Sequence, residues 1–190
     1  MALSFITLTK RLRSDAAASY KRARAAGMPS TRLESAWRSE ATQQKLYEAY
    51  RDYVNCVGPY ANYALRPDLS NHVKGIAVDS HGSQQEWLRA RGVQYGWTQD
   101  ANEPWHFDYD RNNDAVLGVL IRRAARRKIA ADRVAVIKKT LGIRGWYGPR
   151  RNRLAAQRLL HTFGYYKGRI DGVYGPLNKR AWASLKADAN

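Results

Sequence analysis

Two short blocks of alternating sequence constrain the fold more than any other feature of this chain. The first block ends in residues 74–79, where Ile76 and Val78 alternate with small residues and Asp79. Because successive side chains of a strand point to opposite faces, this alternation predicts a strand with one apolar face and one uncrowded face that carries Asp79. A core must therefore lie against one side of this strand.

The second block, residues 105–109, has the same alternation and predicts another strand. Its expected core-facing positions are Trp105, Phe107 and Tyr109. His106 and Asp108 fall on the opposite face. Helical patterns precede and separate the two blocks, so the sequence predicts an α+β domain.

Histidine and carboxylate side chains gather in these two blocks. A catalytic zinc ion commonly takes three nitrogen or oxygen ligands from the protein and keeps one position open. His72, Asp79 and His106 could be those three ligands. Glu103 could then act as a general base on the attacking water. The alternative is that these are packed or surface histidines, because the HExxH zinc helix is absent.

The two blocks also resemble a known family. The pattern SxHxxGxAxD at residues 70–79, followed by ExWH at residues 103–106, is similar to zinc D-alanyl-D-alanine carboxypeptidases and L-alanyl-D-glutamate endopeptidases, which cut the stem peptides of peptidoglycan. The resemblance covers about residues 12–109. It implies a zinc D-Ala-D-Ala-peptidase-like catalytic domain.

The resemblance also implies a role for each matching residue. The implied ligands of one zinc ion per chain are His72, Asp79 and His106. The implied catalytic base is Glu103. Asp108 and His81 match no ligand position of the family, and we interpret them as supporting or surface groups.

Arg38, Gln43 and Ser70 are further candidates for the site. Arg38 lies where a predicted strand meets a predicted helix, a position at which an arginine is usually a solvated charge. Its sequence context, with Gln43 following, also resembles the family, in which the arginine stabilises the developing oxyanion. The resemblance therefore implies a catalytic role for Arg38 and substrate-binding roles for Ser70 and Gln43.

The other patterns predict the elements around the site. We expect helices at residues 8–26, 39–57, 83–91 and 154–163, a further helix containing Trp182, and strands at residues 32–37 and 93–97. Ser39 and Ser83 are the expected N-caps of the second and third helices. The expected buried stripe of the second helix is Leu46, Tyr47, Tyr50 and Val54. Residues 114–139 predict a pair of basic helices.

Charge is distributed unevenly along the 190 residues. Residues 1–110 contain 14 Lys or Arg and 12 Asp or Glu, whereas residues 111–190 contain 19 and 4. The basic second part predicts contact with a polyanion, such as an acidic wall polymer, an anionic membrane surface or a nucleic acid. Cys56 is the single cysteine, which excludes an intrachain disulfide and a cysteine-rich structural zinc site.

The C-terminal part has the pattern of a small separate module. Its sequence GYYxGxIDGxYGP at residues 164–176 resembles the helical peptidoglycan-binding module found beside many wall hydrolases. The Tyr-Gly-Pro turn at residues 147–149 recurs at residues 174–176 and suggests two related turn–helix halves. The aromatic residues that could stack on sugars or form a core are Tyr165, Tyr166, Tyr174 and Trp182. The predicted divisions are a zinc peptidase domain (1–113), a basic helical connector (114–145) and an all-α peptidoglycan-binding module (146–190).

These features together predict a phage endolysin, a zinc metallopeptidase that cuts a stem peptide of bacterial peptidoglycan for host cell lysis. We expect it to cut the L-Ala–D-Glu bond, and a D-alanyl-D-alanine carboxypeptidase is the alternative. Two alternatives come from other classes. One is a basic protein that binds nucleic acid or another polyanion, for which no groove-reading motif is present. The other is a catalytically silent wall-binding protein, against which Glu103 argues.

The N-terminal residues bear on where such a protein would act. Residues 1–8 lack a basic n-region and a long apolar run, so we expect no signal peptide, and we expect no transmembrane segment. An endolysin made in the host cytoplasm and released to the wall fits this expectation. We further expect a monomer whose partners are peptidoglycan and acidic wall polymers, with no nucleic acid.

Overall fold

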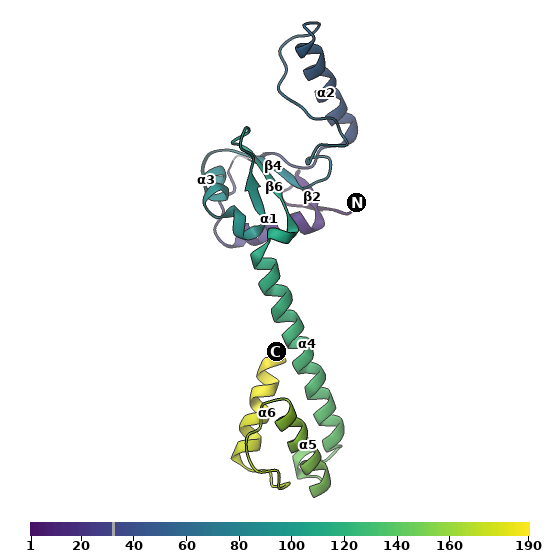
Figure 1. The fold of residues 1–190 in the computed structure, drawn as a ribbon, viewed down its shortest axis with the longest axis vertical. Helices are drawn as coiled ribbons and strands as arrows, with labels where there is room; N and C mark the ends of the chain where they lie inside the picture. The colour runs from purple at the N-terminus through teal and green to yellow at the C-terminus, as the bar shows by residue number, and fades with distance from the viewer. Residues whose placement is uncertain (32) are drawn as a thin grey trace. The chain divides into compact units, whose positions relative to one another are not determined.

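The structure is a computed structural model that describes residues 1–31 and 33–190 (Figure 1). The chain divides into two compact units, residues 1–118 and residues 119–190. The fold is of mixed α/β type. All the strands belong to the first unit, and the elements of the second unit are helical. Nowhere in the described ranges does a helix combine the length and the apolar character needed to cross a membrane.

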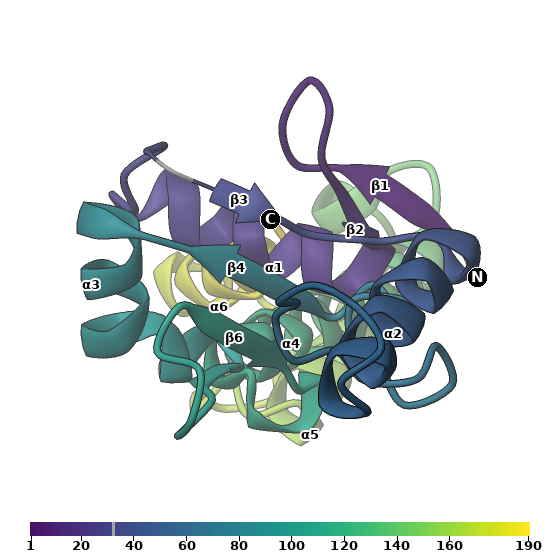
Figure 2. The same cartoon turned by 90° about the horizontal axis from the view of Figure 1, so that it is seen from above.

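A four-stranded antiparallel sheet is the centre of the first unit (Figure 2). Its order is β3 (Leu33–Ser35), β4 (Ala77–Ser80), β6 (His106–Tyr109) and β5 (Trp97–Gln99). The two strands predicted from the alternating blocks, β4 and β6, are therefore direct neighbours. Their register places Asp79 opposite His106.

One face of this sheet is covered by helices α1 (Ser14–Ala25) and α3 (Gly82–Arg91). The core-facing side chains of the strands are apolar, as the alternation predicts, and Val78 and Phe107 are fully buried. Trp97 is also buried and donates a hydrogen bond to Ser19 of α1 at 3.1 Å. The other core members include Leu12, Ala16, Tyr20 and Leu88. The opposite face of the sheet, which carries Asp79 and His106, is not covered by this core.

The N-terminal segment differs from the prediction of one helix at residues 8–26. Residues Leu3–Phe5 (β1) and Arg11–Arg13 (β2) form a hairpin, and the helix begins only at Ser14. The turn is closed by the Ile6 N–H, which donates to the Lys10 carbonyl at 2.9 Å. Leu12 therefore reaches the core from a strand, although its spacing to Ala16 and Tyr20 is also helical. The predicted strand at residues 32–37 is confirmed at Leu33–Ser35, and Arg32 lies outside the described residues.

Two glycines shorten or move the predicted strands. Gly75 has φ +68°, and a Cβ there would lie 2.8 Å from the Arg13 backbone nitrogen, so β4 begins after it at Ala77. Gly96 has φ +82° and ends a 3₁₀ helix, Gly92–Tyr95, where a strand was predicted. Strand β5 therefore starts at Trp97 instead of Val93.

Trp105 does not face the core as predicted. It precedes β6, is 40% exposed, and stacks on His81 with 6.3 Å between ring centroids. Helix α3 also starts earlier than predicted, with His81 and not Ser83 at the N-cap position. The side chain of Gln84 is buried, and its amide donates to the Tyr20 hydroxyl at 2.7 Å.

Helix α2 (Glu40–Val54) has the predicted cap but not the predicted buried face. The Ser39 hydroxyl accepts a hydrogen bond from the Thr42 N–H at 3.1 Å, which confirms the cap. Leu46 and Val54 are 42% and 56% exposed, so the predicted buried stripe is wrong. The tyrosines of α2 pair instead with the loop that follows, as Tyr50–Tyr63 and Tyr53–Tyr60, both with ring centroids 5.1 Å apart. This helix and its loop project from the sheet (Figure 1).

The predicted pair of basic helices is one continuous helix, α4 (Ala115–Leu141). No glycine or proline interrupts residues 119–141, so nothing in the sequence breaks the helix. Its last turns belong to the core of the second unit, which contains Ala130, Ile137, Leu141, Leu160 and Leu185.

The other helices of the second unit are a 3₁₀ helix (Gly145–Tyr147), α5 (Arg150–Thr162) and α6 (Pro176–Asp188). Both α5 and α6 begin at a Tyr-Gly-Pro turn, as the internal repeat predicts: α5 starts directly after Pro149, and α6 starts at Pro176. The buried side chain of Gln157 holds the loop between them. Its carbonyl oxygen accepts from the Asp171 and Gly172 N–H groups at 3.0 and 2.7 Å, and its amide donates to the Val173 carbonyl.

Candidate metal centre

Three side chains converge on the open face of the sheet: His72, Asp79 and His106. Each offers one ligand atom, and these atoms all lie within 4.8 Å of one another. The two carboxylate oxygens of Asp79 lie 3.2 Å from His72 Nε2 and 3.0 Å from His106 Nδ1. His72 is buried, whereas Asp79 and His106 are half-buried, so the cluster is open to solvent on one side.

The fold explains why these three residues meet. Asp79 and His106 are register partners on neighbouring antiparallel strands, so their side chains leave the same face at close range. His72 comes from the turns that precede β4. Its carbonyl accepts a hydrogen bond from the Arg38 N–H at 3.2 Å, which fixes that turn beside the junction of β3 and α2.

The outer hydrogen bonds of the two imidazoles suit a metal centre. The Ala36 carbonyl lies 2.6 Å from His72 Nδ1. Because a carbonyl can only accept, Nδ1 carries a proton, and Nε2, which lies on the Asp79 side of the ring, is the nitrogen that can bind a metal ion. Asp108 lies 3.0 Å from His106 Nε2 and orients the second ring in the same way. Metal-bound histidines usually have such a partner on the other nitrogen. Two histidines and one carboxylate are also a ligand set that zinc accepts.

The charges within the cluster are strongly coupled. Burial alone would raise the pKa of Asp79, but hydrogen bonds from His106 and His72 hold that pKa well below its usual range. Burial alone would lower the pKa of His106, but hydrogen bonds to Asp108 and Asp79 raise it to about 10. Without a cation, the carboxylate of Asp79 is therefore balanced by a proton on His106. A divalent cation would take over that balance.

Glu103 borders the cluster without belonging to it. Its carbonyl accepts from the His106 N–H at 2.8 Å, and its own N–H donates to Asp100 at 3.0 Å. Burial raises the pKa of Glu103 above its ordinary value. The positive charge of His106 opposes this increase, and the negative charges of Asp79 and Asp100 add to it. A carboxylate whose pKa is raised toward neutrality is a better proton acceptor.

Arg38, Gln43 and Ser70 form one hydrogen-bonded chain beside the cluster. Arg38 Nη1 donates to the Gln43 side-chain oxygen at 2.6 Å, and Arg38 Nη2 lies 3.8 Å from Asp79. The same oxygen of Gln43 accepts from the Ser70 hydroxyl at 3.2 Å. Gln43 and Ser70 are buried, whereas the Arg38 side chain is 22% exposed. Gln43 and Ser70 therefore lie behind Arg38, which faces the open site.

The remaining sequence candidates fall into two groups. Asp108 touches a member of the cluster, and its alternation with His106 on one strand face was the sequence signal for this contact. His81 instead pairs with Glu34 at 2.7 Å and lies outside the cluster. Asp100, which fixes the backbone of Glu103, was not identified from the sequence because its role depends on a turn whose geometry no motif specifies.

Comparison with known proteins gives limited matches. No protein-family model matches the sequence, and no curated protein matches it. Similar solved structures include a mutant of the vancomycin resistance D,D-pentapeptidase VanY from a VanB-type resistance cassette in complex with Zn(II). Its sequence is 21% identical to this chain, and the TM-score is 0.44. The match covers 57% of this chain and 78% of the VanY chain. VanYB in complex with D-alanine-D-alanine is also similar, at 20% identity, 57% and 77% coverage and a TM-score of 0.44.

Proposed function

We propose that this protein is a zinc peptidase that cuts the stem peptides of bacterial peptidoglycan. The observation that carries the proposal is the convergence of His72, Asp79 and His106, with Glu103 and Arg38 at the edge of the cluster. A structural zinc site would need no neighbouring base and no neighbouring cation, whereas a hydrolytic site needs both. The motif resemblance of these residues supports peptidoglycan as the substrate.

Each residue has a distinct task in this proposal. Zinc bound by His72, Asp79 and His106 would polarise the scissile carbonyl and lower the pKa of the attacking water. Glu103 takes the proton from this water and delivers it to the leaving amine. Arg38 donates hydrogen bonds to the carbonyl oxygen as negative charge develops there. Gln43 holds the Arg38 guanidinium, and Ser70 in turn holds Gln43.

We propose the L-Ala–D-Glu bond as the bond that is cut. The support is the joining of the site to a second unit with the sequence pattern of a wall-binding module, which suits an enzyme that dismantles intact wall. Removing a terminal D-Ala would leave every crosslink in place. End-group analysis of digested wall should therefore find new N-terminal D-Glu and little free D-Ala. Release of free D-Ala alone would instead identify a D-alanyl-D-alanine carboxypeptidase.

We assign wall binding to the second unit. Tyr166 is buried, and Tyr165, Tyr174 and Trp182 pack against the core, so most of the aromatic candidates are structural. Tyr147 is instead 84% exposed and packs edge-on against Tyr174, with 6.1 Å between ring centroids. An exposed tyrosine beside a second aromatic ring offers a face for stacking on a sugar.

Basic residues of the second unit support an additional contact with acidic wall polymers. In α4 the exposed cations are Arg122, Arg123, Arg126, Arg127, Lys128, Lys138 and Lys139. Sedimentation with purified walls tests both contributions. Tyr147→Ala should weaken binding at every salt concentration, whereas the contribution of the cations should decrease as salt is added. Unchanged binding of Tyr147→Ala, with nucleic acid bound more tightly than wall, would favour the nucleic-acid alternative.

The biological role follows from these two proposals. A peptidase joined to a wall-binding unit suits a lysin, and we propose an endolysin that is made in the host cytoplasm and acts on the wall after release. Expression of the protein together with a membrane-permeabilising agent should lyse the host, whereas Glu103→Ala should not. Lysis by the Glu103→Ala protein at the wild-type rate would contradict this role.

A further inference from the structure

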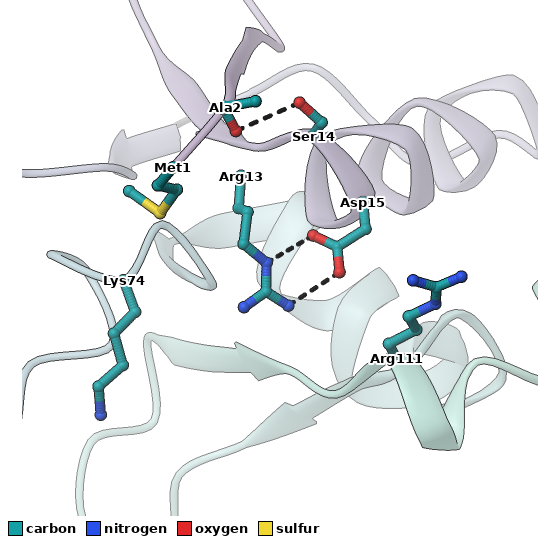
Figure 3. Close-up of a pocket in the computed structure, with 7 residues that line it drawn as sticks. All are labelled: Met1, Ala2, Arg13, Ser14, Asp15, Lys74 and Arg111. Atoms are coloured by element: carbon teal, nitrogen blue, oxygen red, sulfur yellow. Dashed lines mark hydrogen bonds and ion pairs between the residues drawn. The ribbon is translucent and has the colours of Figure 1, made fainter.

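An open groove of about 590 Å³ lies beside the N-terminal hairpin of the first unit (Figure 3). Arg13 and Asp15 face each other in its middle, with Lys74 and Arg111 on either side. A second groove, of about 530 Å³, shares Arg13 and Arg111 with the first. The two grooves therefore adjoin along these arginines.

The charges in the first groove are not balanced. Arg13 is neutralised by Asp15 through two hydrogen bonds of 2.7 and 2.8 Å. Lys74 donates to two neutral oxygens, the Leu69 carbonyl and the Asn71 side chain. Within the described part of the chain, neither Lys74 nor Arg111 has a carboxylate partner. Lys74 and Arg111 are therefore two exposed cations of the first groove that have no carboxylate partner among the described residues.

The second groove runs from Arg111 to residues that border the metal centre. One part of its lining is Asn71, next to the ligand His72, and Asp108, which holds the ligand His106. The carboxylates in this groove are already engaged. Asp108 contacts His106, and Asp110 accepts hydrogen bonds from the Asn112 N–H and the Asn113 side chain. They are thus less available to neutralise Lys74 and Arg111.

We propose that Lys74 and Arg111 form a subsite for a carboxylate of the substrate, remote from the bond that is cut. A peptide bound at the metal centre and extending along the second groove would bring an acidic side chain or an α-carboxylate to these cations. Charge complementarity selects this ligand, because a carboxylate gains two cationic partners there and displaces no existing ion pair. The inference rests on the proposed function, since it assigns substrate specificity to the same site.

The test is calorimetry on the full chain. The zinc-loaded Glu103→Ala protein is titrated with a soluble stem peptide and with the same peptide after its carboxylates are converted to amides. Lys74→Gln/Arg111→Gln in this background should weaken binding of the acidic peptide about tenfold, as two exposed ion pairs would. It should leave binding of the amidated peptide unchanged. Arg89→Gln/Arg91→Gln, the same charge change on exposed residues of α3, is the matched control.

Two results would overturn the inference. One is equal affinity of the parent protein for the acidic and the amidated peptide, and the other is an equal loss of affinity for both peptides in the double variant. Cleavage by the wild-type protein is measured separately with both peptides. If both are cut but bind equally well, the subsite is absent and the proposed function stands. If neither is cut while the charge-dependent binding is present, the subsite stands and the proposed function fails.

Discussion

At the scale of single residues, the surroundings of His106 determine its charge. Its two ring nitrogens each lie 3.0 Å from a carboxylate, Asp79 on one side and Asp108 on the other. The pKa of His106 is about 10 as a result, so the imidazole is protonated at neutral pH when no cation is bound. A metal ion and a proton therefore compete for Nδ1.

This competition predicts that zinc binding releases about one proton per ion between pH 7 and pH 8. The apparent zinc affinity should also rise with pH, by up to about tenfold per unit while His106 remains protonated in the free protein. Calorimetric titration in two buffers with different ionisation enthalpies counts the protons. Asp108→Asn should lower the pKa of His106 and reduce the count. No proton release from the wild-type protein would contradict the protonated state of His106.

Glu103 leads to a prediction about the pH dependence of catalysis. A general base works only when deprotonated, so kcat/KM should fall as pH decreases through the pKa of Glu103, which is raised above its ordinary value. Asp100→Asn removes one negative charge that raises this pKa and keeps an oxygen to accept the Glu103 N–H. The acid limb of the pH profile should therefore move to lower pH. A shift to higher pH would show that Asp100 acts in another way.

At the scale of elements, Asp114 ties three parts of the first unit together. Its buried carboxylate pairs with Arg22 of α1, accepts from the Tyr109 hydroxyl at 3.2 Å, and caps α4 through the Leu117 N–H at 2.8 Å. Burial, followed by the nearby charge of Asp114, raises the pKa of Tyr109 to about 12, so its hydroxyl remains a donor. Removing Asp114 would leave Arg22 without this partner and α4 without its cap.

Asp114→Ala should therefore lower the free energy of unfolding by about 3 kcal/mol, because one partner of a buried ion pair is removed. Asp132→Ala is the matched control. It removes an exposed carboxylate that pairs with Lys128 at 3.1 Å, and should cost less than about 1 kcal/mol. Urea unfolding followed by tryptophan fluorescence gives both values. Equal losses for the two variants would show that burial of the pair contributes nothing.

Sequence alternation predicts elements well where one face meets the core, as in β4 and β6. There, a period of two decides both the strand and the direction of each side chain, and so brings Asp79 beside His106. It fails where two patterns coincide. Leu12, Ala16 and Tyr20 fit a helix, yet a turn at residues 6–10 makes the first of them part of a hairpin. It also fails for α2, because an apolar stripe predicts a helix but not what covers it.

The candidate site, like the fold, is predictable from the sequence in part. Residue type and spacing make His72, Asp79 and His106 candidate ligands, and the motif resemblance implies the same set; the structure brings the three side chains together. Asp100, Lys74 and Arg111 depend on turns and on contacts between distant segments. No local pattern encodes such contacts, and only the folded chain brings the groove residues Arg13, Lys74 and Arg111 together.

At the scale of the whole molecule, the two units have different chemical characters. The first contains the candidate metal centre and nearly balanced charge, whereas the second contains most of the excess positive charge and the exposed Tyr147. This division suits an enzyme that holds an insoluble substrate with one unit and cuts it with the other. We propose that one zinc ion at His72, Asp79 and His106 supports cleavage for which Glu103 is the base.

The most direct test is to measure the rate of stem-peptide cleavage as zinc is added to metal-free protein. The rate should rise linearly and reach a plateau at one zinc ion per chain. Glu103→Ala should bind the same single ion but cleave about 100- to 10,000-fold more slowly, because it lacks only the base. Two results would contradict this zinc-dependent mechanism: a wild-type protein that cleaves no faster with zinc than without it, or a Glu103→Ala protein that reaches the wild-type plateau.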